Sequence, residues 1–133
     1  MNNNTDTLRA HNLKATPQRI EIADALYAHG HLSIDKLYDL LLQKFASISL
    51  ATIYKNINLM LEAAFIQEVK IPNAKSVYEL TKASHSHIAC IKCGEIEDIT
   101  LNLSCVEKDA SALSSFTIKH TDLIFSGICK NCQ

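Results

Sequence analysis

Two Cys-x-x-Cys pairs, Cys90/Cys93 (CIKC) and Cys129/Cys132 (CKNC), constrain the fold of this 133-residue chain more than any other feature. In each pair two thiolates can turn toward one tetrahedral ion, and two such pairs make a closed four-thiolate site for Zn²⁺. A redox-active Cys-x-x-Cys needs only one pair, usually at the start of a helix, whereas Cys93 ends a strand-like run and is followed by Gly94. The pattern therefore predicts a structural zinc, one ion per chain, that ties the C-terminal end of the chain to a strand about 35 residues earlier.

The fifth cysteine, Cys105, stands outside both pairs. It falls in the first turn of an expected helix, where a thiolate is somewhat favoured, so a reactive thiol is one interpretation. A small side chain that faces the core is the other interpretation, and it is the one we expect.

The composition favours a folded protein inside the cell. Hydrophobic residues make up 47% of the chain, which is enough to build a core. The polar start, MNNNTDTLRAHNLK, lacks the apolar segment of a signal peptide, and no apolar run approaches the roughly 20 residues of a membrane span. We therefore expect a cytoplasmic protein with reduced thiols and no membrane partner.

Charge alone neither favours nor excludes a nucleic-acid partner. The formal net charge is −1, and residues 1–80 carry eight Lys or Arg and eight Asp or Glu. Any DNA-binding surface must therefore come from segregation of the charges onto one face of the molecule.

Helix signals dominate the first 65 residues. A weak helix is expected around Thr5 to His11, and three stronger helices follow the capping residues Thr16, Ser33 and Ser49. Apolar residues recur at helical spacing after each cap and are expected to face the core: Ile20, Ala23, Leu26 and Tyr27, then Leu37, Leu40 and Leu41, then Leu50, Ile53, Ile57, Met60 and Leu61.

The period changes after Phe65. The runs IQEVKI (66–71) and SVYEL (76–80) alternate in polarity and are joined by PNAK, which predicts a β-hairpin. Four helices followed by a hairpin are the outline of a winged helix-turn-helix domain, which we place at residues 1–80.

Residues 81–133 predict a small α/β domain. Strands are expected at His85–Cys90, Glu95–Leu101 and Thr117–Ile128, with one helix between the last two. A single helix leaves half of such a sheet uncovered, so we expect a homodimer. The predicted fold class is α+β, with an N-terminal winged helix-turn-helix domain followed by a small α/β dimerisation domain.

The expected helix of this second domain carries its own start signal. Ser104 and Glu107 have the spacing of a capping box, in which each side chain bonds the other residue's backbone N–H. Val106, Ala110 and Leu113 should then form the apolar face of the helix.

The histidines raise the question of a second metal. In a strand, His85 and His87 share one face, while Cys90 lies on the other. One strand can therefore feed two metal sites. Of the neighbours Glu97 and Asp98, only one can face the histidines. A His-x-His pair is only moderately specific, and surface or satisfied core histidines remain the ordinary alternative.

Five motifs occur in a fixed order along the chain: LKATPQR (13–19), SLATIYKNIN (49–58), VYEL (77–80), HSHIACIKCG (85–94) and the terminal CKNC. Their order and spacing resemble those of the ferric uptake regulator (Fur) family of metal-dependent bacterial repressors, over nearly the whole chain. The resemblance implies a winged-helix domain followed by an α/β dimerisation domain, in agreement with the pattern of helices and strands.

The resemblance also implies metal ligands. It supports the zinc site of Cys90, Cys93, Cys129 and Cys132, and it implies a regulatory Fe²⁺ or Mn²⁺ site between the two domains, with the ligands His31, Glu79, His85, His87 and Asp98. Occupancy of that site would set the angle between the DNA-reading heads, so that DNA affinity depends on metal concentration.

The sequence departs from the family at two places. Some members have a further metal site in the second domain, and the matching positions here hold Ser84, Ser86, Cys105 and Thr121, a poor ligand set, so we expect no such site. Ala64 stands where the family commonly has Gly at the end of the helix before the hairpin. If that residue is left-handed, Ala costs about 1 kcal/mol, which predicts a rearranged helix end.

DNA contacts are expected from two places. The apolar stripe of the helix after Ser49 leaves a short polar face able to enter a major groove: Thr52, Tyr54, Lys55 and Asn58. Lys14 and Arg19, before and at the start of the second helix, suit phosphates or an A·T-rich minor groove. By resemblance, the dimer should bind double-stranded, palindromic, A·T-rich operator DNA.

Asp98 suggests which signal is sensed. In the family, the matching carboxylate is commonly Glu in iron-responsive repressors and Asp in the peroxide-responsive, PerR-type branch. The shorter Asp can leave bound iron open to H₂O₂, and the oxidant formed there would attack His31 or His85, release the metal and end repression. The resemblance therefore favours a peroxide-responsive repressor.

Two other interpretations remain. One is an iron-responsive repressor of iron uptake. The other belongs to a different class: a zinc or thiol-based redox enzyme, or a zinc-stabilised interaction module. Four cysteines closing on one ion leave no open metal position and no lone redox pair, so we do not expect an enzyme.

Overall fold

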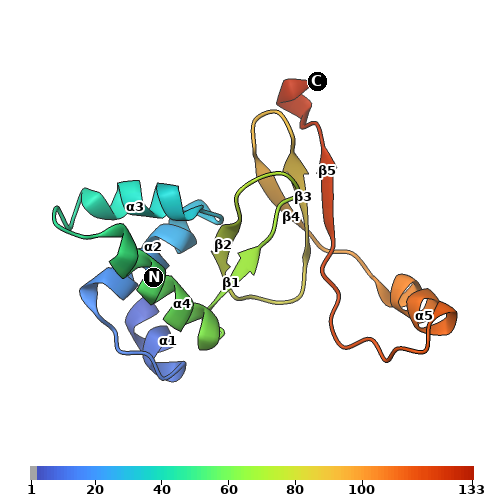
Figure 1. The fold of residues 1–133 in the computed structure, drawn as a ribbon, viewed down its shortest axis with the longest axis horizontal. Coiled ribbons are helices and arrows are strands. Elements are labelled where there is room, and N and C mark those ends of the chain that lie inside the picture. The colour runs from blue at the N-terminus through green and yellow to red at the C-terminus, as the bar shows by residue number, and fades with distance from the viewer. Residues whose placement is uncertain (1–2) are drawn as a thin grey trace. The chain divides into compact units, whose positions relative to one another are not determined.

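The computed structural model describes residues 3–133. It divides into two compact units, one reaching to Lys82 and the other spanning Ala83–Gln133. The first unit consists of helices and a hairpin, and the second of a three-stranded sheet with one α-helix (Figure 1). This mixed content confirms the predicted α+β class. None of the helices in residues 3–133 is long and apolar enough to cross a membrane.

The first unit follows its capping signals closely. Its elements are α1 (Asn4–Ala10), α2 (Pro17–His29), α3 (Ile34–Leu42), α4 (Leu50–Glu62), β1 (Ile66–Val69) and β2 (Val77–Leu80). The side-chain oxygens of Thr16, Ser33 and Ser49 each accept a backbone N–H three residues later, which confirms the three predicted N-caps. The antiparallel pairing of β1 with β2 confirms the hairpin.

The core of the first unit is formed by apolar side chains from all four helices and from β1. Fully buried examples are Leu8, Ile22, Leu37, Ile57 and Ile66. Two residues of the predicted stripes lie outside it: Tyr27 is 64% exposed and Leu50 is 38% exposed. Both stand at the edge of a stripe, where a small rotation of the helix moves a side chain from the core to the surface.

The second unit is built around a central strand, β3 (Ser86–Cys90), which is flanked by β4 (Ile96–Ile99) and β5 (Ile124–Gly127). β3 pairs with β4 antiparallel and with β5 parallel. The observed strand β5 is much shorter than the strand predicted over Thr117–Ile128. The physical reason is that its partner β3 offers only five residues, so the ladder runs from Ile124 to Gly127 and no further.

Helix α5 (Ser104–Leu113) does not use the predicted capping box. Leu103 is its N-cap, and no side chain caps the helix. Ser104 is therefore inside the first turn, and its backbone N–H bonds the side-chain oxygen of Asn102 instead, at 3.0 Å. The prediction was wrong because an Asx-type bond to Asn102 starts the helix one residue earlier than the Ser–Glu spacing implied.

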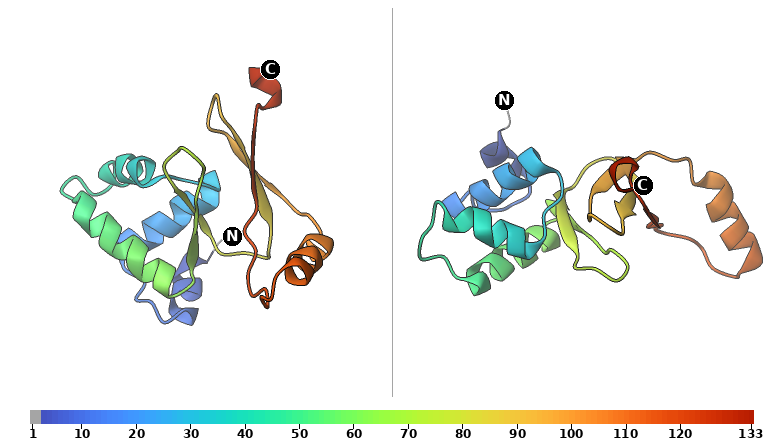
Figure 2. Two further views of the ribbon diagram at one scale, coloured as in Figure 1. Left: turned by 45° about the vertical axis from the view of Figure 1, so that its right-hand side comes forward. Right: turned by 90° about the horizontal axis from the view of Figure 1, so that it is seen from above.

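Helix α5 stands apart from the three-stranded sheet, at the end of two extended connections (Figure 2). None of its residues is buried. Its predicted apolar face is open to solvent in the single chain, with Val106 60% exposed and Leu113 90% exposed. Cys105, predicted to face the core, is also exposed, because there is no core beneath this helix in one chain.

Ala64 adopts the left-handed conformation, with φ +57°. The preceding residue, Ala63, is the C-cap of α4, and the N–H of Phe65 donates to the carbonyl of Met60 at 3.0 Å. This bond is the long one of a Schellman motif. The left-handed residue is therefore present as expected, but the helix end is not rearranged: Ala64 occupies the position where Gly is favoured.

We predict that Ala64→Gly raises the free energy of unfolding by about 1 kcal/mol, because Gly removes the clash of Cβ with the backbone at positive φ. Urea denaturation followed by circular dichroism measures the change. Ala63→Gly is the matched control: Ala63 has φ −80°, and Gly there should lower stability by about 0.5 kcal/mol. Equal destabilisation by both substitutions would contradict the left-handed strain.

Candidate metal centres and DNA-reading surface

The four cysteines of the two Cys-x-x-Cys pairs meet at one end of the second unit. Cys90 ends β3, and the chain turns back through Gly94, whose φ of +79° permits the tight turn. The second pair follows β5, with Cys132 at the end of a 3₁₀ turn. Because β3 and β5 run parallel, with Cys90 paired to Gly127, both Cys-x-x-Cys pairs lie at the carboxyl ends of these two strands, at the same end of the sheet.

The geometry of the four sulfurs fits a tetrahedral zinc ion. One sulfur from each of Cys90, Cys93, Cys129 and Cys132 lies within 4.8 Å of all the others. The Sγ atoms of Cys93 and Cys129 are 3.7 Å apart. Four Zn–S bonds of about 2.3 Å in a tetrahedron require sulfur–sulfur separations of about 3.8 Å. The cluster therefore suits a closed, four-thiolate zinc site.

The surroundings of the cluster favour charge on its innermost sulfur. The backbone N–H of Cys129, at 3.3 Å, and then that of Cys93 donate to the Cys90 sulfur and lower the pKa of that thiol to about 6. By contrast, the sulfur of Cys129, followed by that of Cys93, raises the pKa of Cys132 to about 12. Without a cation, neighbouring sulfurs this close share protons rather than all ionise, so the arrangement calls for a metal ion.

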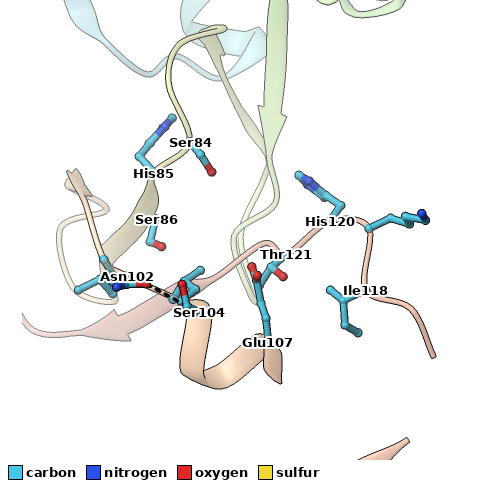
Figure 3. A pocket seen from close by; sticks show the side chains of 12 residues that line it. Ser84, His85, Ser86, Asn102, Ser104, Glu107, Ile118, His120 and Thr121 are labelled. Atoms are coloured by element: carbon cyan, nitrogen blue, oxygen red, sulfur yellow. Dashed lines mark hydrogen bonds between the residues drawn. The ribbon is translucent and has the colours of Figure 1, made fainter. Parts of the chain in front are cut away.

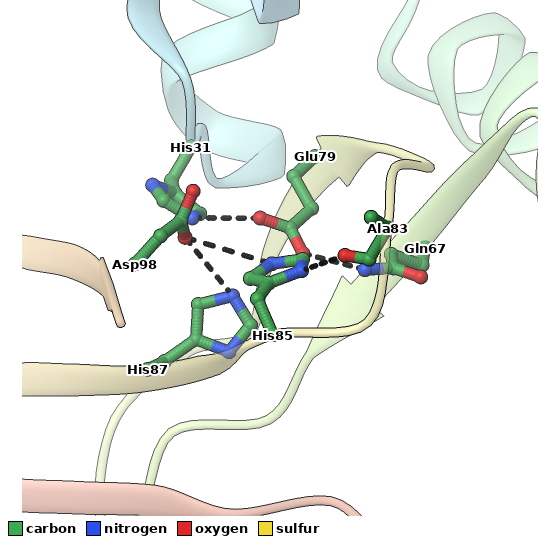
Figure 4. A network of polar contacts seen from close by, with 7 residues as sticks. All are labelled: His31, Gln67, Glu79, Ala83, His85, His87 and Asp98. Carbon is green, nitrogen blue, oxygen red and sulfur yellow. Dashed lines mark hydrogen bonds and ion pairs between the residues drawn. The ribbon is translucent and has the colours of Figure 1, made fainter. Parts of the chain in front are cut away.

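In the first unit, His31 and Glu79 form a close pair. The Nε2 atom of His31 lies 2.7 Å from a carboxylate oxygen of Glu79, and the other oxygen accepts the amide N–H of Gln67 at 2.6 Å (Figure 4). Glu79 is only 1% exposed. A buried carboxylate needs such partners or a cation, so His31 and Glu79 are candidate metal ligands.

Backbone hydrogen bonds set the positions of His31 and Glu79. Leu32 and Tyr78 exchange two backbone hydrogen bonds, of 2.8 and 3.1 Å, which hold His31 beside β2. Gln67 lies opposite Glu79 in the β1–β2 register. The hairpin thus carries one ligand-type residue, and the bridge from the end of α2 brings the other to it.

In the second unit, two histidines converge on one carboxylate. Nε2 of His87 lies 3.3 Å, and Nε2 of His85 3.6 Å, from Oδ1 of Asp98 (Figure 4). The two imidazole rings are 4.5 Å apart, centre to centre. His87 pairs with Asp98 in the β3–β4 register, whereas Glu97 pairs with Ile88. Asp98, rather than Glu97, therefore faces the histidines.

The second unit contains a hollow of about 330 Å³, and its lining includes Ser84, Ser86 and Thr121, three of the four positions that the resemblance matched to a further metal site. Hydroxyl groups contribute to its lining, from Ser84, Ser86, Ser104 and Thr121 (Figure 3). Cys105, the fourth of those positions, is not part of the lining. Glu107 and His120 do line it, and the sequence analysis missed them because they become neighbours only when α5 and the segment before β5 fold together.

The predicted DNA-reading residues of α4 lie outside the core. Tyr54 is 48% exposed, Lys55 and Asn58 are exposed, and Ile53 and Ile57 are buried behind them. Thr52 is half-buried, and its hydroxyl lies 2.9 Å from that of the capping residue Ser49. The Thr52 hydroxyl is therefore already hydrogen-bonded at the N-terminus of α4.

Lys14 and Arg19 differ from each other in their surroundings. Lys14 is exposed in the loop before α2. Arg19 bonds Asn56, at 3.0 Å, and the main-chain carbonyl of Lys14, at 3.1 Å. Asn56, on α4, is buried and was not considered in the sequence analysis, because it falls within the helical stripe that we assigned to apolar residues.

The sequence is similar to those of known proteins over most of its length. The sequence model of the ferric uptake regulator family matches residues 10–126. The peroxide-responsive repressor PerR of Staphylococcus epidermidis is 33% identical over 129 residues, which cover 96% of this chain and 86% of that protein.

Two solved structures extend the comparison. The peroxide stress regulator of Campylobacter jejuni has a TM-score of 0.74 at 33% identity and covers 98% of this chain and 100% of its own. The Vibrio cholerae ferric uptake regulator has a TM-score of 0.78 at 28% identity, covering 96% of this chain and 100% of its own. The family match and the 33% identity across nearly the whole length show that this chain belongs to the ferric uptake regulator family.

Proposed function

We propose that the chain is a metal-dependent, homodimeric transcriptional repressor of the cytoplasm that binds palindromic, A·T-rich operator DNA and responds to peroxide. Residues 1–80 form the DNA-binding domain, and residues 81–133 form the dimerisation and metal-binding domain. Membership of a family of transcriptional regulators supports this proposal. So do the similarities to PerR of S. epidermidis and to the C. jejuni peroxide stress regulator.

The observation that carries the proposal is a pair of incomplete ligand sets. The first unit offers His31 and Glu79, and the second offers His85, His87 and Asp98. Neither set alone saturates an ion that takes five or six ligands. Together they give three imidazole nitrogens and two carboxylates, a donor set suited to Fe²⁺ or Mn²⁺. We propose that the two sets bind one regulatory ion.

A shared ion would link metal concentration to DNA affinity. Because each unit supplies part of the ligands, metal binding selects one arrangement of the two units over all others. If that arrangement is the one whose reading heads match the operator, metal and DNA bind with positive coupling, and each raises the affinity of the other by the same factor.

The zinc site has a separate, structural role. Four thiolates leave no open position on the ion, so the site has no catalytic use. Instead it joins β3 to the C-terminal segment in a unit whose buried residues are few: among its described residues, Ser86, His87, Ala89 and Cys90. The exposed apolar residues of α5 support a dimer in which the second chain covers this helix.

Asp98 supports the peroxide response over the iron response. Fe²⁺ held by these ligands would supply the redox chemistry that activates H₂O₂. In the net reaction, a ring C–H of His31 or His85 would give up two electrons and take one oxygen atom from the peroxide, and the other oxygen would leave as water. The oxidised ring is a poorer ligand, the two units separate and repression ends. An iron-responsive repressor is the second candidate, favoured by the likeness to the V. cholerae protein.

We predict that Cys90→Ser lowers bound zinc from about one ion per chain to nearly none, because three thiolates hold the ion far less tightly than four. Zinc is measured by inductively coupled plasma mass spectrometry, and dimerisation by analytical ultracentrifugation. The dimer should dissociate as the second unit unfolds. Cys105→Ser is the matched control, and its zinc content and mass should be unchanged. A zinc-loaded dimer of Cys90→Ser would refute the assignment.

We predict that His85→Ala and His87→Ala give folded, zinc-containing dimers that lose Mn²⁺-dependent operator binding. Loss of one ligand should lower the affinity for the regulatory metal by about 100-fold or more, since loss of a group that only hydrogen-bonds a ligand already lowers metal affinity by about 10- to 100-fold. Fluorescence anisotropy of labelled operator, titrated with Mn²⁺, measures the effect. His120→Ala is the control, because His120 also pairs with an aspartate, Asp122 at 2.9 Å, but is exposed. Equal loss in both would place the regulatory ion elsewhere.

We predict that equimolar H₂O₂ adds one oxygen atom to His31 or His85 in the Fe²⁺-loaded protein and abolishes operator binding, while the Mn²⁺-loaded protein is unaffected. Peptide mass spectrometry locates the oxygen, and anisotropy follows DNA release. Asp98→Glu is the informative variant: its longer side chain should close the open side of the iron and slow the oxidation. Oxidation confined to cysteines would return the protein to the iron-responsive alternative.

A further inference from the structure

One network of hydrogen bonds joins the two parts of the first unit that are proposed to read DNA. Arg19, near the start of α2, donates from Nε to the side-chain oxygen of Asn56 on α4, and from Nη1 to the carbonyl of Lys14. Asn56 in turn donates its amide N–H to the carbonyl of Thr52, at 3.0 Å. Two side chains thus connect α4, α2 and the loop before α2.

Asn56 is an unusual residue for its position. It is only 9% exposed and lies between Ile53, Ile57 and Met60, which are fully buried on the same helix. A buried amide costs free energy unless its hydrogen bonds are made, and an apolar side chain would suit this stripe better. Both ends of the Asn56 amide are satisfied, one of them by Arg19. Its contribution is therefore to hold the guanidinium rather than to fill the core.

The loop that carries Lys14 is held at several points. Leu13 is buried and its N–H bonds the carbonyl of Leu8, at 3.0 Å. The carbonyl of Lys14 accepts the N–H of Thr16, at 3.0 Å, as well as Arg19. The backbone of Lys14 is fixed in this way, while its side chain remains exposed.

We propose that Arg19 is a positioning residue, which through Asn56 and the Lys14 carbonyl sets the Lys14 side chain at a fixed offset from the reading face of α4. This proposal rests on the proposed function. It replaces the expectation that Arg19 is a phosphate ligand. Both Nε and Nη1 of Arg19 are engaged inside the protein, by Asn56 and by the Lys14 carbonyl, and the planar guanidinium suits two such acceptors at once. The offset matters because Lys14, at a phosphate or in the minor groove, and α4, in the major groove, would contact one DNA site together.

Arg19→Lys separates the two roles because it keeps the charge and removes the planar fork. Under the proposal, Arg19→Lys weakens operator binding on the order of tenfold, about the value of one hydrogen bond from a charged group. Asn56→Ala should give a similar loss. Arg9→Lys is the matched control: it is the same exchange on α1, at an exposed arginine, and should leave affinity unchanged. Thermal unfolding of each variant corrects for any loss of folded protein.

A double-mutant cycle with Lys14→Ala gives the decisive readout. If Arg19 acts through Lys14, then Arg19→Lys costs little once Lys14 is gone, and the two losses do not add. Operators with A·T pairs replaced by G·C identify the positions where Lys14→Ala loses discrimination, and Arg19→Lys should lose it at those same positions only. A uniform loss across all operators, additive losses, or a silent Arg19→Lys would overturn the proposal.

Failure of the proposed function looks different. If Lys14→Ala itself leaves operator affinity and its salt dependence unchanged, Lys14 is not a DNA contact, and the assignment of the reading surface fails first. If Lys14→Ala weakens binding but the cycle is additive, the reading surface stands and only the positioning role of Arg19 is lost.

Discussion

The convergence of four cysteine sulfurs at one end of a three-stranded sheet is the constraint on which the second unit depends. Among its described residues this unit buries few side chains, and two of the buried ones are polar. Such a small core supplies little hydrophobic stabilisation. The four sulfurs lie within 4.8 Å of one another, so that one zinc ion can bind them all. The free energy of metal binding then adds to the stability of this small unit. The parallel pairing of β3 with β5 places both Cys-x-x-Cys pairs where one ion reaches them.

The same strand carries the second set of ligands. Since alternate residues of β3 face opposite sides, Cys90 and His87 point away from each other, and the register that aligns Cys90 with Gly127 also aligns His87 with Ile124. On its other edge, β3 aligns His87 with Asp98. A slip of one residue between β3 and β4 would turn the His87 side chain to the face away from Asp98. The zinc site, by joining Cys90 to the cysteines after β5, holds the register of β3 with β5.

Three buried polar side chains lie at the places where function is proposed. Glu79 and His87 are buried among the candidate ligands, and Asn56 is buried behind the proposed reading face. Each has partners: His31 and Gln67 for Glu79, Asp98 for His87, and Arg19 for Asn56. Apolar residues at these positions would stabilise the fold more simply. Since burying a polar group costs free energy, these residues contribute the geometry of a proposed functional site rather than stability.

The sequence by itself determined those features that depend on neighbours a few residues away. Thr16, Ser33 and Ser49 cap helices because the N–H groups they accept lie three residues on, and the two Cys-x-x-Cys pairs chelate for the same local reason. The positive φ of Ala64 belongs to this group. Only the tertiary structure decided what depends on distant partners. The choice of Asp98 over Glu97 follows from strand register, because Asp98 is paired with His87 across two strands. The partner of Arg19 lies 37 residues away, on another helix, where no local spacing could reveal it.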